Sequence, residues 1–391
     1  MMTLHYEFPI IRHIDDVLPF IKDDRAFIVA KRDWGTVVNY TMAGNNTFPT
    51  VTDKASAIRR ECRGMIFDLN GKLIARRYHK FFNLGEREDL ISIDISKPHV
   101  IMNKLDGSMV TPIKLADGSI RWGTKMGITD VSMQAEVFVA SRPLYEKFSR
   151  DYIDLGYTPI FEWISRKQRI VIDYPEDNLI LTAVRDNDSG RYLNYNQLNT
   201  IRIIFRIPVV VPVVDVLKPI DDLNNFAEKL RKREDIEGVV LRFDDGHMVK
   251  IKTDAYVNLH RAKSLLDNER DVIELVLDQK EDDLIALLNE DDKKRLNNYA
   301  RNVWDDVMGF VFLINSHLQL IKTLGTHRKD FAISSETMIP LLRSAVFANW
   351  DKEFCESVYV IHTIKQHLGS KARFERLRDI LKTAVWKETH E

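Results

Sequence analysis

The spacing of apolar residues changes once along this chain of 391 residues, and that change constrains the fold more than any other feature. From about residue 25 to residue 255, short alternating apolar segments are separated by turn residues, which is typical of strands. From about residue 256 onward, apolar residues recur three and four positions apart, as in VWDDVMGFVFLINSHLQLIKTL, which indicates helices. We therefore expect an α+β domain over residues 1–255 and an all-helical domain over residues 256–391.

Turn residues predict that the sheets of the first domain are antiparallel. Asn70-Gly71 lies between two strand-like segments, and Asp117-Gly118 lies between VTPIKLA and SIRWG, so each pair indicates a tight hairpin. The segments RDNDSGRYL and RFDDGHMVKIK are two further hairpin candidates. A single helix is predicted over Val131–Tyr152.

Composition limits the class of protein without indicating a partner. Lys and Arg number 57 against 58 Asp and Glu, so only a local basic groove could bind nucleic acid. The two cysteines, Cys62 and Cys355, form no metal-binding pattern, and the N-terminus lacks the pattern of a signal peptide. No uninterrupted apolar stretch approaches the length of a membrane span. We expect a monomer without a membrane partner in the cytoplasm, which would be the host cytoplasm for a viral protein.

Lys104 is the candidate nucleophile of the first domain. It follows the apolar segment IMN and precedes Asp106-Gly107-Ser108. A lysine amine attacks only when it is neutral, so nearby cations or burial must favour loss of its proton. The short KxDG pattern alone more often marks a surface lysine beside an ordinary turn.

Further motifs on both sides of Lys104 favour the nucleophile. ECRGMIFD and KFFNLGE precede it, and IFEWISRKQRIVIDY, IEGVVLRF and HMVKIKTDAYVNLH follow it. In this order they resemble the nucleotidyltransferase motifs of ATP-dependent ligases and capping enzymes. The resemblance is closer to the T-even phage type of RNA ligase, and it extends from about residue 60 to residue 290, including SLLDN after the last lysine motif.

Strand alternation places Lys250 and Lys252 on the same face of the segment HMVKIKT. If a two-residue turn at Asp245-Gly246 closes the hairpin, Val239 lies opposite Lys252, and Glu237 shares the face of the two lysines. A three-residue turn would place Glu237 on the opposite face. We favour the two-residue turn, which brings a carboxylate beside two cations.

The resemblance implies that Lys104 forms a covalent bond to AMP. It also implies a set of nucleotide-contacting residues, comprising Tyr40, Arg63, Lys80, Gly107, Lys125, Glu162, Glu237, Lys250 and Lys252. Arg63 would contact the RNA phosphate as well as the nucleotide.

Three of the proposed positions leave alternatives open. Glu162 would bind ribose hydroxyls or a metal-held water, and its alternative is an edge strand that exposes it to water. Phe82 stacks on the nucleotide or packs in the core. Asp282 corresponds to an acidic, metal-associated residue of the family, and it is equally suited to be the N-cap of the next helix.

The implied activity is ATP-dependent RNA ligation with Mg²⁺, or with Mn²⁺ as an alternative, in RNA repair. The implied partner is RNA, and the family suggests a nicked tRNA anticodon loop. One alternative is a DNA ligase or capping enzyme, whose last lysine motif is usually followed by a β-barrel rather than by helices. Another is a non-catalytic RNA-binding protein on a ligase scaffold.

Overall fold

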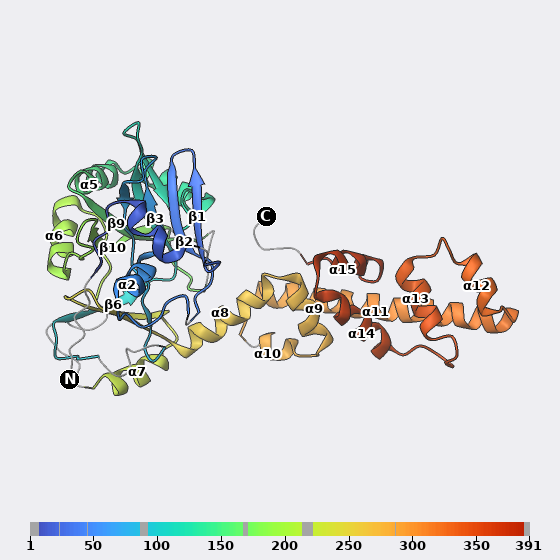
Figure 1. Cartoon of the computed structure of the whole chain (residues 1–391). Coiled ribbons are helices and arrows are strands. Elements are labelled where there is room, and N and C mark those ends of the chain that lie inside the picture. Colours follow the sequence, from blue (N-terminus) through green and yellow to red (C-terminus); the bar gives the residue numbers. More distant parts are fainter. Residues whose placement is uncertain are drawn as a thin grey trace. The chain divides into compact units, whose positions relative to one another are not determined.

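The protein folds into two compact units, Met1–Val257 and Asn258–Glu391. The computed structural model describes residues 8–22, 24–44, 46–86, 93–166, 171–212, 222–285 and 287–386. Figure 1 shows strands and helices in the first unit and helices in the described part of the second. An α+β class with a helical C-terminal region is therefore confirmed.

Three four-stranded sheets form the first unit, in the orders β1-β2-β3-β4, β10-β9-β7-β8 and β5-β12-β11-β6. Every neighbouring pair is antiparallel except β5 and β12, which are parallel. The strands are β1 (Phe27–Arg32), β2 (Gly35–Tyr40), β3 (Met65–Phe67), β4 (Leu73–Ala75), β5 (Phe82–Asn83), β6 (His99–Lys104), β7 (Ser108–Lys114), β8 (Ile120–Gly123), β9 (Tyr157–Ile164), β10 (Asn178–Asp186), β11 (Gly238–Phe243) and β12 (Met248–Lys252).

Three of the predicted hairpins are confirmed by strand pairing. The turn at Asn70-Gly71 joins β3 to β4, the turn at Asp117-Gly118 joins β7 to β8, and β11 pairs with β12. In the fourth candidate, RDNDSGRYL, the chain turns back at the end of β10, and its pairing consists of one isolated antiparallel bridge between Arg185 and Tyr192.

The single helix predicted over Val131–Tyr152 is wrong, because two helices occupy this region. The first, α4 (Asp130–Ala140), ends before Ser141, and α5 (Pro143–Asp154) begins at a proline. A proline has no backbone N–H and disfavours helical geometry in the preceding residue, so Pro143 can start a helix but cannot continue one. Both helices contribute to the core of the sheet β10-β9-β7-β8, through Ala135, Val139, Tyr145 and Phe148. The other helical elements of this unit are η1 (Ile14–Asp16), α1 (Leu18–Ile21), α2 (Lys54–Glu61), α6 (Tyr195–Phe205) and α7 (Leu223–Arg231).

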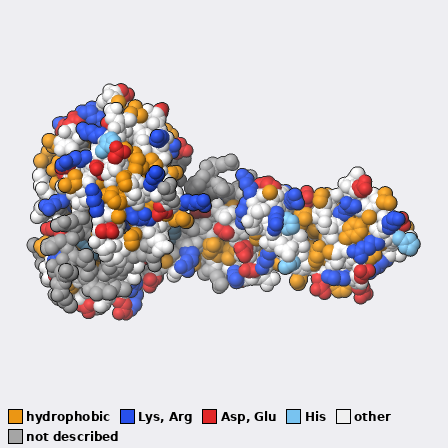
Figure 2. All heavy atoms as spheres, viewed as in Figure 1, with side chains coloured by type: hydrophobic (Ala, Val, Ile, Leu, Met, Phe, Trp, Pro, Cys, Tyr) orange, Lys and Arg blue, Asp and Glu red, His pale blue; other side chains and the backbone are white. Residues whose placement is uncertain are grey.

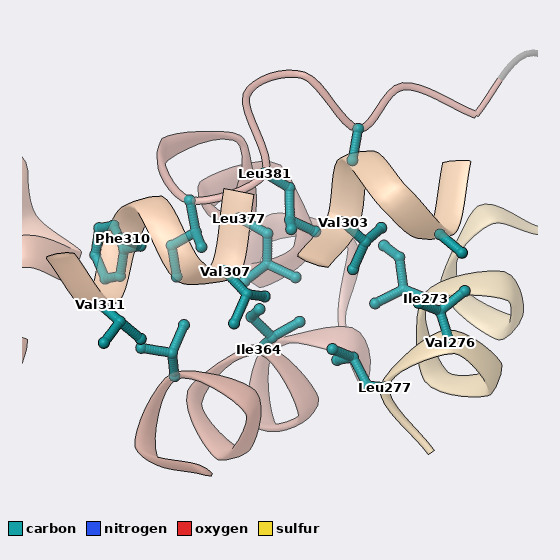
Figure 3. Close-up of a cluster of buried hydrophobic side chains, with 14 of the residues drawn as sticks. Ile273, Val276, Leu277, Val303, Val307, Phe310, Val311, Ile364, Leu377 and Leu381 are labelled. Carbon is teal, nitrogen blue, oxygen red and sulfur yellow. The ribbon is translucent and has the colours of Figure 1, made fainter. Parts of the chain in front are cut away.

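The second unit is built around the long helix α11 (Glu290–Leu324), which contributes ten buried side chains. Figure 3 shows Val303, Val307 and Phe310 of α11 among apolar side chains of the surrounding helices. By length and composition α11 could cross a membrane, but a core helix meets the same criteria. The remaining helices are α8 (Asp254–Leu266), which runs across the unit boundary, α9 (Glu269–Leu277), α10 (Glu281–Ile285), α12 (Arg328–Ser334), α13 (Pro340–Ala348), α14 (Ser357–Leu368), α15 (Lys371–Arg376) and η2 (Leu377–Asp379).

A buried ion network ties α2 to two other segments of the first unit. Glu61, at the end of α2, accepts a hydrogen bond from Arg76 Nε at 3.1 Å and another from an Arg185 terminal nitrogen at 2.7 Å. All three side chains are buried. Burial alone would raise the pKa of Glu61, but Arg185 and Arg76 lower it to about 2.

We predict that Glu61→Gln lowers the free energy of unfolding by about 3–5 kcal/mol, because two buried arginines lose their counter-charge. Urea unfolding at neutral pH measures this, and the exposed Glu146→Gln, which pairs with Arg150, should change it by less than about 1 kcal/mol. Since the pKa of Glu61 falls from 4.5 to about 2 on folding, its stabilisation is present above pH 4.5 and is lost as the pH drops toward 2. Equal effects of the two substitutions would contradict the prediction.

Candidate active site

A cavity of about 540 Å³ opens in the first unit and brings together most of the predicted site residues. They come from separate strands and connecting segments, and those that line it are Tyr40, Arg63, Lys80, Lys104, Gly107, Lys125, Glu162, Lys250 and Lys252. On the face shown in Figure 2, Lys and Arg side chains are interspersed with Asp and Glu. The lining of the cavity differs, because the described residues that line it include six Lys or Arg side chains and one carboxylate.

Lys104 ends β6 and shares a buried carboxylate with Lys252. Its Nζ lies 2.6 Å from Glu237 Oε1, and Lys252 Nζ lies 3.0 Å from the same oxygen. Glu237 itself does not line the cavity, and its side chain is only 2% exposed. The carboxylate therefore holds two amines close together from behind the cavity wall.

The predicted register of the hairpin β11–β12 is wrong by one residue. Phe243 N donates to the His247 carbonyl, so the loop contains three residues, and Gly238 rather than Val239 lies opposite Lys252. Strict alternation would now turn Glu237 away from the lysines. Glu237 lies before β11 begins at Gly238, so the alternation of the strand does not fix its side. The φ of Gly238 is +154°, and a Cβ there would lie 2.1 Å from the Ile251 carbonyl oxygen. The expected grouping of Glu237 with the lysines is thus found, but for a different reason.

The loop after Lys104 is held by contacts that the sequence analysis did not identify. Asp106 is buried and accepts hydrogen bonds from Tyr256 Oη at 2.8 Å and from the backbone N–H groups of Val171 and Ile172 at 2.7 and 2.6 Å. Its own backbone N–H donates to Tyr174 Oη at 2.9 Å. Tyr256 lies four residues after Lys252 in the segment KTDAYVNLH. A buried Asp in the KxDG motif needs a hydrogen-bond donor, and that requirement was the one signal in the sequence that pointed to a residue such as Tyr256.

Gly107 allows this loop to approach β9 closely. A Cβ at this position would lie 2.4 Å from the carbonyl oxygen of Trp163. Any other residue would push the nucleophile loop away from Glu162, which precedes Trp163 in β9.

Glu162 is a half-buried carboxylate of the cavity wall, with no ion-pair partner in the described part of the chain. The edge-strand alternative is wrong, because β9 lies between β10 and β7. Burial raises the pKa of Glu162 to about 7 against the opposing effect of Lys104, and Glu237 and Asp106 raise it further. Within the described ranges no hydrogen bond or ion pair reaches this carboxylate, which leaves it available to ligand hydroxyls or to a hydrated cation.

The cations of the cavity lower one another's proton affinity. Burial, together with Lys80, Lys104 and Arg63, lowers the pKa of Lys250 to about 7. Lys80 Nζ lies 5.2 Å from the centre of the Tyr40 ring, and Lys125 Nζ lies 5.3 Å from it. Burial would raise the pKa of Tyr40, but these lysines and Arg63 lower it instead. This excess of positive charge is suited to a polyanion.

Two of the predicted positions lie elsewhere. Phe82 packs in the core with Phe48 and does not line the cavity, whereas the neighbouring Phe81 does. Asp282 is exposed in α10 of the second unit, and it is not the N-cap because the helix already begins at Glu281. Over the described residues, no group of three or more His, Cys, Asp or Glu side chains could hold a metal ion.

Comparison with known proteins shows the family of this chain. Residues 61–256 match a protein family described as RNA ligase. A putative RNA ligase of Thermovibrio ammonificans is 27% identical over 374 residues, which cover 93% of this chain and 92% of that protein. RNA ligase 1 of bacteriophage TS2126 is 24% identical over 312 residues, covering 76% of this chain and 75% of that protein. The protein therefore belongs to the RNA ligase family, of the phage type that the motifs around Lys104 resemble.

Proposed function

We propose that the protein is an ATP-dependent RNA ligase that joins a 5′-phosphate end to a 3′-hydroxyl end. The observation that supports this most is Lys104 Nζ at the wall of a cavity that five other cations line. A nucleoside triphosphate carries its negative charge on the phosphate oxygens, and preorganised cations stabilise the charge that develops there during transfer.

In the first step, Lys104 Nζ attacks the α-phosphorus of ATP, the bond to pyrophosphate breaks, and a lysyl–AMP phosphoramidate forms. The amine must lose a proton before it attacks. Glu237 Oε1, 2.6 Å away, is placed to accept the proton. Lys250 and Lys252 neutralise the phosphates and the departing pyrophosphate.

Mg²⁺ fits the carboxylate that the cavity provides, and Mn²⁺ is an alternative. Glu162 is the residue that would hold the ion, through a bound water, because its carboxylate lines the cavity and forms no hydrogen bond or ion pair within the described chain. A divalent ion supplies charge neutralisation at phosphate oxygens. Ribose hydroxyls would compete for the same carboxylate. We also propose Asp282, an exposed residue of α10 in the second unit, as a metal-associated residue.

In the second step, the 5′-phosphate of an RNA end attacks the lysyl–AMP phosphorus and releases Lys104. In the third step, the 3′-hydroxyl attacks that RNA phosphate, the strand is joined and AMP leaves. Arg63 lines the cavity and is placed to contact the RNA phosphate as well as the nucleotide. A DNA ligase or capping enzyme is less well supported, because helices follow Lys252 from Asp254 onward. A non-catalytic scaffold is disfavoured by the presence of Lys104, Lys250 and Lys252 in one cavity.

The helical second unit is proposed to select the RNA, with a nicked tRNA anticodon loop as the substrate that the family suggests. Its core is a separate cluster that runs from Ala262 to Trp386. We also propose that the protein acts as a monomer in the cytoplasm, which would be the host cytoplasm for a viral protein.

Lys104→Ala tests the proposed function directly. We expect wild-type protein to retain radiolabelled AMP after incubation with ATP and Mg²⁺, and to pass it to RNA ends. The variant should lose this label yet still seal RNA supplied with an adenylylated 5′ end, because Lys104 acts in AMP capture alone. Absence of label on wild-type protein, or covalent AMP on the variant, would overturn the proposal.

The binding of ATP should weaken as the pH rises through about 7. The pKa of Lys250 is about 7 in the empty cavity, so a bound triphosphate favours its charged form and binding takes up a proton above that pH. Affinity for a non-hydrolysable ATP analogue should fall by at most about tenfold per pH unit between about pH 7 and 8.5. Lys250→Met should bind more weakly at about pH 6.5 and lose most of this slope.

Calorimetry across this range measures how the affinity for the ATP analogue changes with pH. Lys97→Met, which pairs with Asp245 outside the cavity lining, is the control. Glu162→Gln is a second variant, since the pKa of Glu162 is also about 7. An unchanged slope in Lys250→Met would show that Lys250 is not the group responsible.

A protein ending at Val257 should still form lysyl–AMP, because the cavity-lining residues that the structure describes all precede that point. It should lose the preference for a nicked tRNA stem-loop over single-stranded RNA of equal length, since recognition of folded RNA by shape needs surface beyond the catalytic cavity. The ratio of the two sealing rates is compared with that of the full-length protein after solubility has been checked. An unchanged ratio would locate substrate choice in the first unit.

A further inference from the structure

Arg77 is a buried cation for which the proposed chemistry has no direct role. It follows β4, and its side chain reaches three other parts of the first unit. Its Nε donates to Thr111 Oγ1 at 3.0 Å, one terminal nitrogen donates to the Gly64 carbonyl oxygen, and the other donates to the Gly123 carbonyl oxygen at 2.9 Å. Only 1% of the residue is exposed.

The neighbouring Arg76 shows what is unusual about Arg77. Both are fully buried, but Arg76 pairs with the carboxylate of Glu61. Within the described residues Arg77 has no carboxylate partner, and its guanidinium is stabilised by neutral oxygens alone. Burial, and to a lesser extent Arg63, lowers the pKa of Arg77 to about 9, so it remains charged at neutral pH. A buried cation without a counter-charge is costly, which suggests a role other than stability.

The two carbonyl groups that Arg77 binds belong to segments that carry cavity cations. Gly64 directly follows Arg63, and Gly123 lies two residues before Lys125. These segments touch each other, because a Cβ on Gly64 would lie 2.7 Å from Lys125 Cα. Lys125 itself is exposed in a tight turn, in which Thr124 N donates to the Gly127 carbonyl at 2.8 Å. The turn that carries Lys125 begins directly after Gly123, and the hydrogen bond from Arg77 to the Gly123 carbonyl therefore anchors that turn.

We propose that Arg77 is a positioning residue for adenylyl transfer: by binding the carbonyl groups of Gly64 and Gly123 it joins the segments that carry Arg63 and Lys125 and keeps both cations aimed into the cavity. Its planar guanidinium donates in three directions at fixed angles, which a lysine ammonium cannot reproduce. Charge alone would therefore not satisfy the role. The catalytic part of this inference rests on the proposed function, whereas the structural part does not.

Double-mutant cycles distinguish positioning from general stability. Arg77→Lys should lower kcat/KM for lysyl–AMP formation by about 10²-fold, the usual effect of a small displacement of catalytic groups. In the wild type, Arg63→Ala and Lys125→Ala should each lower it by about 10²-fold. In the Arg77→Lys background, Arg63→Ala and Lys125→Ala should each lower kcat/KM only a few fold further, because both cations are already misplaced. Losses that multiply independently would overturn the proposal.

Arg76→Lys is the matched control, since Arg76 has the same burial and adjoins Arg77 but contacts no cavity-lining residue among those described. It should lower thermal stability at least as much as Arg77→Lys does, yet leave the effects of Arg63→Ala and Lys125→Ala at full size. If Arg77→Lys does not fold, Thr111→Val is the second variant. It removes the hydrogen bond between Arg77 Nε and Thr111 Oγ1 with little change of side-chain volume, and it should show the same coupling to Arg63→Ala and Lys125→Ala at a smaller magnitude.

Hydrogen–deuterium exchange gives a readout that does not depend on ATP. In Arg77→Lys or Thr111→Val, exchange should accelerate about residues 63–66 and 123–127, whereas Arg76→Lys should leave both segments at the wild-type rate. If the variants show this exchange pattern but the wild-type protein forms no lysyl–AMP, the proposed function is refuted and the positioning role is retained. Unchanged exchange in both segments would refute the positioning role whatever the activity.

Discussion

The carboxylate of Glu237 is the contact on which the geometry of the active site depends. It lies behind the cavity wall and bonds both Lys104 and Lys252 through a single oxygen. Two amines at these distances would repel each other without it. Because Lys104 ends β6 and Lys252 ends β12, with β11 between them, this one contact also joins the ends of two strands of the sheet.

Arginine is used for two different purposes around this centre. Arg76 and Arg185 neutralise the buried Glu61 and join α2 to the segments after β4 and in β10. Arg77 instead binds backbone oxygens beside the cavity. The first group joins separate segments of the unit, and the second links the fold to segments that carry two cations of the cavity lining. Both are needed because loops carry Arg63 and Lys125, and loops hold a geometry only when something anchors them.

Local rules predicted well those features that depend on neighbours in sequence. Asn70-Gly71 and Asp117-Gly118 do form hairpin turns, since glycine tolerates the backbone that such turns require. The same rules failed where one residue overrides a period. Pro143 divides the expected helix, and the three-residue loop before His247 shifts the register of β11 and β12. The contacts of Asp106 with Tyr174 and Tyr256 join residues far apart in the chain, so no local pattern could reveal them.

The sequence by itself determined the class of fold and the family, and it singled out Lys104 as the candidate nucleophile. Those follow from the order of short motifs and from the change of apolar spacing near residue 256, and both are properties of the chain read in one dimension. Only the tertiary structure decided which side chains meet. Glu237 reaches Lys104 from just before the start of β11 at Gly238, and Phe82 packs in the core while Phe81 lines the cavity. Burial decided the proton affinities of Glu162 and Lys250, since the cost of a charge depends on what surrounds it in space rather than on its neighbours along the chain.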